Sequence, residues 1–233
     1  MDIDERYYPY SKLCSKVLGF TGSDNQGILG LEAKYDAYLS GTPGQILTLT
    51  DAWGVEVKNG NEERDEPEKG SNLYTSIDIN IQSYAQQLAQ KTLEQKQAKS
   101  VSIIVMNPEN GEILAMTNEP EYDLNNPYEL NSDLLISSTG TSKMDLLNNM
   151  WRNFCINDTY EPGSIFKMVT ATAALETGSV TLNDHFTCGG SAIVADRKIR
   201  CHKTTGHGTQ TFTQTVMNSC NPAFIEWGRR VGT

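Results

Sequence analysis

The chain has 233 residues, of which 38% are hydrophobic, enough apolar material for a sizeable core. Its 29 acidic residues outnumber its 19 basic ones, for a formal net charge of -10, and no Lys/Arg-rich run could neutralise a row of phosphates, which excludes nucleic acid as an expected partner. No stretch has the length and apolar character of a membrane span, and the first residues lack a signal-peptide pattern, so as written the chain is expected to be soluble and globular.

Residues 1–68 are predicted to form a small accessory region that contains β-structure. Short apolar runs and turn signals alternate here, and residues 46–60 alternate as paired strands would. The charged stretch 59–72 contains Gly and Pro but no apolar period, which is typical of a linker. We therefore expect the linker to close the first region and a second domain to cover residues 69–233.

The second domain is predicted to open with a helix followed by a hairpin. Apolar residues recur at helical spacing over residues 79–97, with polar residues between them. Residues 100–120 show two β-rich apolar runs joined by Asn-Pro-Glu-Asn-Gly, a sequence suited to a tight connection. Residues 120–158 lack a sustained period and predict long loops with short helical turns. This order suggests a sheet with helices packed on it.

A Ser and a Lys three positions apart mark the start of the next predicted helix, which runs from Ser164 to Gly178. On a helix, Ser164 and Lys167 share a face, so their side chains can meet. A Ser hydroxyl becomes a nucleophile when a base takes its proton, and a Lys can serve if apolar surroundings lower its pKa. The apolar neighbours of Lys167 in the sequence suggest such surroundings. The alternative is a helix cap followed by an exposed Lys.

A second polar cluster, Ser219-Cys220-Asn221, precedes another apolar helical stretch. Ser-x-x-Lys, Ser-Asp-Asn and Lys-Thr-Gly together form the motif set of class A β-lactamases and penicillin-binding proteins. In this chain Cys220 stands in place of the central Asp. The two clusters together favour serine-based acyl transfer over simple helix capping.

Several segments extend this likeness across the chain, and the chain resembles a class B penicillin-binding protein, the peptidoglycan transpeptidase of division, elongation or sporulation. The segments that carry it are RYYPYSKLCSKVLGFTGSDNQGILGLEAKYDAYLSGTPG, LYTSIDINIQSYAQQ, VMNPENGEILAM, YEPGSIFK and GHGTQTFTQTVMNSCNPAFIEWG. The resemblance implies an α/β (α+β layered) serine transpeptidase or β-lactamase-like fold. It also implies that the chain is incomplete at both ends.

The resemblance assigns four catalytic residues. Ser164 would be the acylated nucleophile and Lys167 its base, Ser219 would relay protons to the leaving amine, and Asn221 would bind the substrate backbone and help hold Lys167. The substrates implied are peptidoglycan stem peptides ending in D-Ala-D-Ala, with β-lactams as covalent mimics and no cofactor in catalysis. The location implied is the outer face of the cell membrane, among cell-wall synthesis or divisome-type membrane proteins.

The third motif of the family, Lys-Thr-Gly on an inner strand, has no counterpart here. Residues Lys203 to Gly206 read Lys-Thr-Thr-Gly, but they precede Ser219 and carry one residue too many, so we reject them as that motif. The chain as given is therefore predicted to lack that strand and to be of doubtful activity alone. The alternative functions are a β-lactam sensor and a β-lactamase.

Two residue types that commonly bind zinc, Cys and His, recur between residues 188 and 220. The residues are Cys188, Cys201, His202, His207 and Cys220. Their spacing is not that of a zinc finger or ribbon, so a disulfide and ordinary packed thiols remain alternatives. If zinc binds, we expect the three cysteines with one of the two histidines, in a site that braces the Ser219–Asn221 loop from behind.

Overall fold

The computed structural model describes residues 6–47, 63–131 and 140–232, in two compact units, Met1–Asp158 and Thr159–Thr233. The helices and strands of the first unit are α1 (Ser15–Leu18), α2 (Gly30–Lys34), α3 (Asp36–Leu39), β1 (Gln45–Leu47), β2 (Glu63–Asp65), α4 (Ile79–Lys96), β3 (Val101–Met106), β4 (Ile113–Glu119), α6 (Lys143–Trp151) and α7 (Phe154–Asn157). No helix in the described ranges is both long and apolar enough to cross a membrane.

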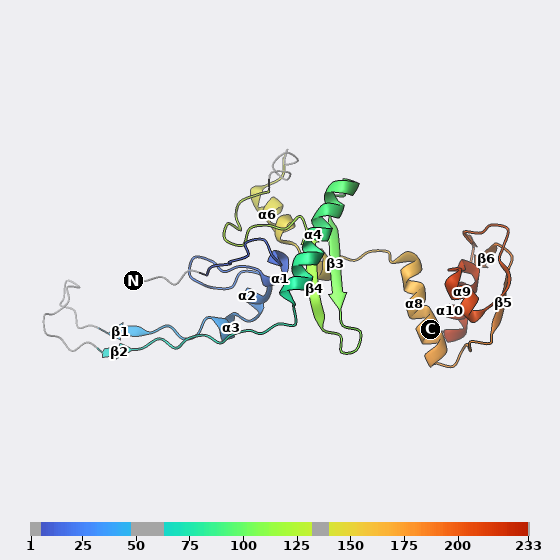
Figure 1. Cartoon of the computed structure of the whole chain (residues 1–233), viewed down its shortest axis with the longest axis horizontal. Helices are drawn as coiled ribbons and strands as arrows, with labels where there is room; N and C mark the ends of the chain where they lie inside the picture. The colour runs from blue at the N-terminus through green and yellow to red at the C-terminus, as the bar shows by residue number, and fades with distance from the viewer. Residues whose placement is uncertain (1–5, 48–62, 132–139, 233) are drawn as a thin grey trace. The chain divides into compact units, whose positions relative to one another are not determined.

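The centre of the first unit is helix α4 packed on the β3–β4 hairpin (Figure 1). The Asp78 side chain caps α4 by accepting hydrogen bonds from two backbone N–H groups. The small residues Ala85 and Ala89 are buried, which lets the helix approach the sheet closely. The Gln82 amide bonds both backbone groups of Met116 on β4, at 3.1 and 2.8 Å. The helix predicted over residues 79–97 and the hairpin predicted over residues 100–120 are both confirmed.

The accessory region contains strand pairing, although only part of it can be compared with the prediction. Strand β1 pairs antiparallel with β2. Strand β2 lies inside the charged stretch 59–72, which we had predicted to be a linker, so that interpretation is wrong for its central residues. Residues 48–60 of the predicted alternating run lie outside the described residues.

Residues 140–158 contain a regular helix that the sequence reading did not predict. Helix α6 is capped by the Ser142 side chain, which accepts a hydrogen bond from the Asp145 N–H. Its two buried residues, Leu147 and Met150, join Phe20 in an apolar cluster. The helix has only nine residues, which is too short for its apolar period to be recognised among the surrounding polar residues. Residues 132–139, which belong to the stretch 120–158 predicted as loops, lie outside the described residues.

A buried carboxylate ties the N-terminal helices to strand β4. Glu121 accepts hydrogen bonds from the Ser15 hydroxyl, the Lys16 N–H and the Asn118 N–H. Burial raises the pKa of Glu121, although these hydrogen bonds and the nearby Lys16 ammonium act in the opposite direction. These partners therefore offset only part of the cost of burying the Glu121 carboxylate.

The second unit carries both candidate sites. Its elements are a 3₁₀ turn η1 (Gly163–Ile165), α8 (Phe166–Glu176), β5 (His185–Cys188), β6 (Ser191–Val194), β7 (Arg197–Arg200), β8 (Gly208–Thr211), α9 (Phe212–Met217) and α10 (Asn221–Val231). Strand β5 pairs with β8 and β6 pairs with β7, both antiparallel. Helix α8 packs against α10 (Figure 1). The predicted helix from Ser164 to Gly178 is thus a 3₁₀ turn that continues as α8.

The core of the second unit forms around Trp227 on α10, which has no exposed surface. Its ring meets Phe186 and Phe212 at centroid distances of 5.9 and 5.8 Å. Its indole N–H donates to the Thr215 hydroxyl at 3.0 Å. This fixes α10 against α9, and the short connection between these helices carries Ser219 and Cys220.

Candidate active site and cysteine cluster

Ser164 lies in the 3₁₀ turn immediately before α8, where it is exposed. Gly163 precedes it with a φ of 57°, a left-handed conformation that Gly adopts without steric cost. The Ile165 N–H bonds the Pro162 carbonyl at 3.3 Å and closes the turn. The Ser hydroxyl therefore lies at the N-terminus of an eleven-residue helix, whose dipole favours negative charge there.

Lys167 brings the four predicted catalytic residues together. Its ammonium nitrogen lies 3.2 Å from the Ser164 hydroxyl oxygen, on the same side of the helix, as the spacing predicted. It also donates to the carbonyl and the hydroxyl of Ser219, at 2.8 and 2.9 Å. The side-chain oxygen of Asn221 lies 2.6 Å from the same nitrogen, so four oxygen atoms surround an amine that has at most three N–H groups to donate. A single amine thus connects the α8 turn with the connection between α9 and α10.

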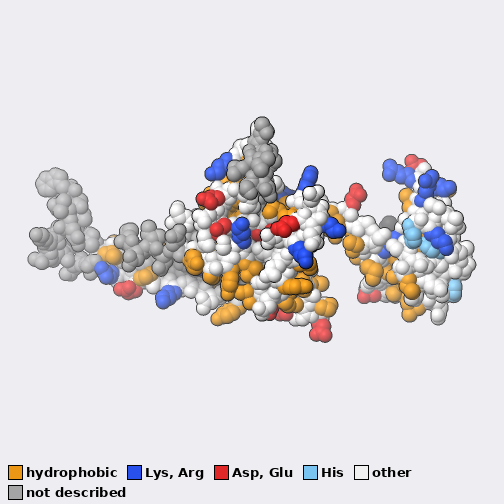
Figure 2. Space-filling view, turned by 45° about the horizontal axis from the view of Figure 1, so that its top comes forward, with side chains coloured by type: hydrophobic (Ala, Val, Ile, Leu, Met, Phe, Trp, Pro, Cys, Tyr) orange, Lys and Arg blue, Asp and Glu red, His pale blue; other side chains and the backbone are white. Residues whose placement is uncertain are grey.

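The surroundings of Lys167 differ from those predicted. Its apolar sequence neighbours Ile165, Phe166, Met168 and Val169 are between 55% and 69% exposed, so they do not enclose the amine. Hydrophobic side chains accordingly appear on the surface of this unit (Figure 2). Desolvation nevertheless lowers the pKa of Lys167, with Cys201 and Cys220 acting in the opposite direction. The Phe224 ring of α10, 5.6 Å from the nitrogen, is one apolar group beside it.

The connection between α9 and α10 presents alternate side chains to different partners. Ser219 has a φ of 44°, an uncommon conformation for a residue other than Gly. It is held by its N–H bond to Val216 and by the following N–H bond from Cys220 to the Thr215 carbonyl. Ser219 and Asn221 both reach Lys167, whereas Cys220 between them is fully buried. This arrangement explains how a Cys replaces Asp at the centre of the motif without occupying the space near Lys167.

The structure adds one group that sequence reasoning missed. The Asn221 side-chain nitrogen donates to the backbone carbonyl of Arg200 at 2.9 Å, so Asn221 links Lys167 to the end of strand β7. A backbone carbonyl has no signature in residue type, and no sequence signal could have identified it. Lys203 to Gly206 form a turn, with the Gly206 N–H on the Lys203 carbonyl, which agrees with rejecting them as a strand motif.

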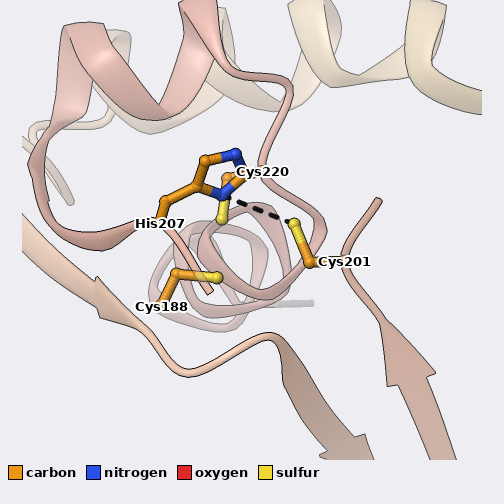
Figure 3. A group of neighbouring side chains, drawn as sticks. All are labelled: Cys188, Cys201, His207 and Cys220. Carbon is orange, nitrogen blue, oxygen red and sulfur yellow. Dashed lines mark hydrogen bonds between the residues drawn. The ribbon is translucent and has the colours of Figure 1, made fainter. Parts of the chain in front are cut away.

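The second unit also contains a cluster of three cysteines and a histidine (Figure 3). Cys188 ends β5, Cys201 follows β7, His207 precedes β8, and Cys220 precedes α10. Their ligand atoms all lie within 4.8 Å of one another, and the His207 Nδ1 lies 3.6 Å from the Cys201 sulfur. The three sulfurs are buried and unbridged. The end of β5, the connection from β7 to β8 and the connection from α9 to α10 therefore meet at this cluster.

The structure distinguishes between His202 and His207, either of which the sequence allowed as a zinc ligand. His207 is a member of the cluster, and His202 is not, although the two rings contact each other at a centroid distance of 5.0 Å. Burial opposes ionisation of the Cys188 thiol, but hydrogen bonds from the N–H groups of His207 and Gly190 outweigh it and lower its pKa to about 6. Burial raises the pKa of Cys220 to about 12. The pair therefore forms one thiolate more readily than two.

Comparison with known proteins places the chain in a family. Residues 101–233 match the penicillin-binding protein transpeptidase domain, and residues 2–75 match the penicillin-binding protein dimerisation domain. The chain therefore belongs to the penicillin-binding protein transpeptidases, and its relatives confirm the predicted resemblance to class B members. The predicted α+β transpeptidase fold is confirmed as well.

Individual relatives give the scale of the likeness. Stage V sporulation protein D of Bacillus subtilis is 38% identical over 97% of this chain and 33% of that protein. Penicillin-binding protein PbpB of Mycolicibacterium smegmatis is 29% identical over 98% of this chain and 33% of that protein. The crystal structure of penicillin-binding protein 2X from Streptococcus thermophilus has a TM-score of 0.72 at 26% identity, covering 98% of this chain and 33% of that one. The chain thus spans about a third of the length of these curated relatives.

Proposed function

We propose that this protein is a serine D,D-transpeptidase that cross-links peptidoglycan and binds penicillin covalently. The observation that carries the proposal is the amine of Lys167, which lies 3.2 Å from the Ser164 hydroxyl while Ser219 and Asn221 hold it from the other side. Family membership supports it, as does the name of a relative 33% identical over 77% of this chain, the peptidoglycan D,D-transpeptidase FtsI of Buchnera aphidicola.

In the proposed reaction Lys167, in its neutral form, removes the proton from the Ser164 hydroxyl. The oxygen attacks the carbonyl carbon between the two terminal D-Ala residues of a stem peptide. The C–N bond breaks, Ser219 passes a proton from Lys167 to the leaving D-Ala amine, and an ester on Ser164 remains. An amine of a neighbouring strand then attacks the ester, forms the new amide and releases Ser164. The helix dipole of α8 favours the developing negative charge on the Ser164 oxygen.

Two other functions share the first half of this reaction. A β-lactam sensor would stop at the acyl-enzyme, and a β-lactamase would hydrolyse it with an activated water. The rate of ester loss after acylation by penicillin distinguishes them. A transpeptidase keeps the β-lactam ester for a long time but turns over stem peptides, whereas a sensor turns over neither and a β-lactamase turns over penicillin.

The test of the proposed function is labelling with a fluorescent penicillin. The product of the complete gene should be labelled, the Ser164→Ala variant should not, and Lys167→Ala should be labelled far more slowly. The chain of residues 1–233, whose sequence contains no Lys-Thr-Gly motif, is tested in parallel, because we propose that it reacts poorly alone. Equal labelling of the Ser164→Ala variant would refute the assignment of the nucleophile.

The predicted domains and setting are part of the same proposal. We propose that residues 1–68 form the C-terminal part of an accessory domain, supported by the dimerisation-domain match over residues 2–75, and that residues 69–233 begin the transpeptidase domain. The related curated proteins are penicillin-binding proteins, so we propose a membrane location with the catalytic domain outside the cytoplasm. A solved complex of the similar protein PBP2 with MreC from Helicobacter pylori makes membrane proteins of cell-wall synthesis the proposed partners.

We further propose that Cys188, Cys201, His207 and Cys220 hold a structural zinc ion, separate from the catalytic chemistry. Three sulfurs and one imidazole are a frequent structural zinc set. Tetrahedral ligands at about 2.0–2.3 Å from zinc lie about 3.3–3.8 Å from one another, so atoms grouped within 4.8 Å need only small shifts to coordinate it. The cluster also joins segments that are distant in sequence, which is what structural zinc does in small domains.

Metal analysis tests the zinc proposal directly. The protein is purified with a thiol reductant and without added metal, and its zinc content is measured by mass spectrometry. We expect about one equivalent per chain, and cobalt replacement should give the visible absorption of cobalt bound to thiolates. Less than about a tenth of an equivalent, together with no cobalt spectrum, would refute the site and leave packed thiols as the explanation.

A further inference from the structure

The cysteine cluster and the polar residues around Lys167 belong to the same two stretches of chain. Cys220 stands between Ser219 and Asn221, both of which bond the Lys167 amine. Cys201 directly follows Arg200, whose carbonyl accepts the hydrogen bond from Asn221. A metal ligand is therefore adjacent in sequence to every group that holds the far side of Lys167.

These two stretches are linked twice. On the side of Lys167, the Asn221 side chain spans from the amine, at 2.6 Å, to the Arg200 carbonyl, at 2.9 Å. In the cysteine cluster, the sulfurs of Cys201 and Cys220 lie within 4.8 Å of each other, as Figure 3 illustrates. A metal ion joining the two sulfurs would make a second, stronger bridge parallel to the hydrogen-bonded one. The separation of Arg200 from Asn221 would then be set by metal–sulfur bonds.

Ser219 adds a reason for such a bridge. Its φ of 44° is a conformation that a residue other than Gly keeps only when its surroundings fix it. The next residue, Cys220, is fully buried, and its N–H bond to Thr215 fixes it from the α9 side. A metal bond at its sulfur would fix the same residue from the side of β7.

We infer that the metal held by Cys188, Cys201, His207 and Cys220 is a positioning element for Lys167. It fixes Ser219 and Asn221 at the distances that place the amine against the Ser164 hydroxyl, and so it sets the rate of acylation. The metal itself takes no part in bond making. This inference rests on both the proposed transpeptidase function and the proposed zinc site.

The expected effect follows from the geometry that acyl transfer needs. Without metal, three buried thiols must share a space sized for metal–sulfur bonds, and the two stretches are free to separate. Displacement of a catalytic group by about 1 Å costs on the order of 100-fold in rate. We therefore expect metal loss to lower the rate constant of acylation by about 10- to 100-fold. The reversible affinity for penicillin should change far less, because the metal does not contact the ligand site.

Variants of the histidine ligand test the inference without altering the residues next to Lys167. In the product of the complete gene, His207→Ala should lose the metal and slow acylation to the extent that a chelator slows the wild type. His207→Cys offers a fourth thiolate and should restore both metal and most of the rate. His202→Ala is the matched control, because His202 contacts His207 but lies outside the ligand group. Acylation rate constant, reversible affinity, zinc content and thermal unfolding are measured for each protein.

The zinc site, the transpeptidase function and the positioning role of the metal would each be refuted by a different result. If no variant binds metal, the zinc site is wrong. If Ser164→Ala is labelled, the transpeptidase assignment is wrong. If His207→Ala loses the metal, stays folded at the assay temperature and acylates at the wild-type rate, the positioning role is refuted. A loss confined to reversible affinity, or a rate that His207→Cys does not restore despite bound metal, would refute it as well.

Discussion

Replacing Asn221 by Asp tests whether Lys167 works as a neutral base. The side-chain oxygen at position 221 lies 2.6 Å from the Lys167 amine, so the substitution places a negative charge beside it with little change in shape. An opposite charge within this range raises the pKa of a Lys by about 1–3 units. In the wild type the pKa of Lys167 is lowered by desolvation, which favours the neutral form.

The sign of the effect follows from these two directions. In the proposed reaction the neutral amine is the active form, so acylation should rise as pH increases through the pKa of Lys167, and a raised pKa should move this rise to higher pH. At a pH below the wild-type midpoint, the acylation rate of Asn221→Asp should be about 10- to 1000-fold lower than that of the wild type, a factor of ten for each unit by which the pKa of Lys167 rises. The assay is the second-order rate constant for fluorescent penicillin between about pH 6 and pH 10, measured on the product of the complete gene.

Asn221→Ala is the matched control for this measurement. Both variants lose the donation from Asn221 to the Arg200 carbonyl, whereas Asn221→Ala also loses the hydrogen bond from Lys167 and adds no charge. We expect it to lower the rate without moving the midpoint upward, whereas Asn221→Asp should recover at high pH. Equal midpoints for the two variants, in proteins with equal thermal stability, would show that Lys167 is not the base.

Three further predictions concern the stability of each unit and metal binding. Trp227→Phe keeps an aromatic ring in the core but loses the bond to Thr215, and should lower the free energy of unfolding in urea by about 1–3 kcal/mol. The raised pKa of Glu121 means that its stability contribution is present at low pH and is lost as pH rises through its folded pKa, so stability should decrease from acidic toward neutral pH, and Glu121→Gln should flatten that slope. Gly190→Ala places a methyl group 2.0 Å from a carbonyl oxygen at a φ of 90° and should abolish metal binding, whereas Gly189→Ala, with open space around it, should keep it; equal zinc contents would contradict this.

The sequence predicted the features whose signal is local. The helix that became α4 has a period sustained over eighteen residues and an Asp cap before it, and the pairing of Ser164 with Lys167 needs only one turn of helix. Helix α6 escaped prediction because its buried residues are only two. The approach of Asn221 to Lys167 crosses 54 positions and was expected only from the family motif. The pattern of polar and apolar residues alone does not predict this contact between Asn221 and Lys167.

The cysteine cluster could be predicted from the sequence only in part. Residue types pointed to zinc, but the ligands follow one another at intervals of thirteen, six and thirteen positions, which match no local metal motif. They meet because β5 pairs with β8 and β6 pairs with β7, so the end of β5 and the connection from β7 to β8 lie close together, next to the connection from α9 to α10. The choice of His207 over His202 depends on where that convergence falls, which neighbouring positions in a sequence do not reveal.

Cys220 shows how one short connection can serve two purposes. Ser219 and Asn221 must both face Lys167, which leaves the residue between them facing the interior. That residue is excluded from catalysis by geometry, so its identity is free to serve the structure behind the site. In the proposed zinc site the Cys220 thiol would bind this connection to strands β5 and β7, and a displacement of Cys220 would move both Ser219 and Asn221. Stability of the cluster and reactivity of Ser164 are therefore expected to change together, and the variants of His207 measure that coupling directly.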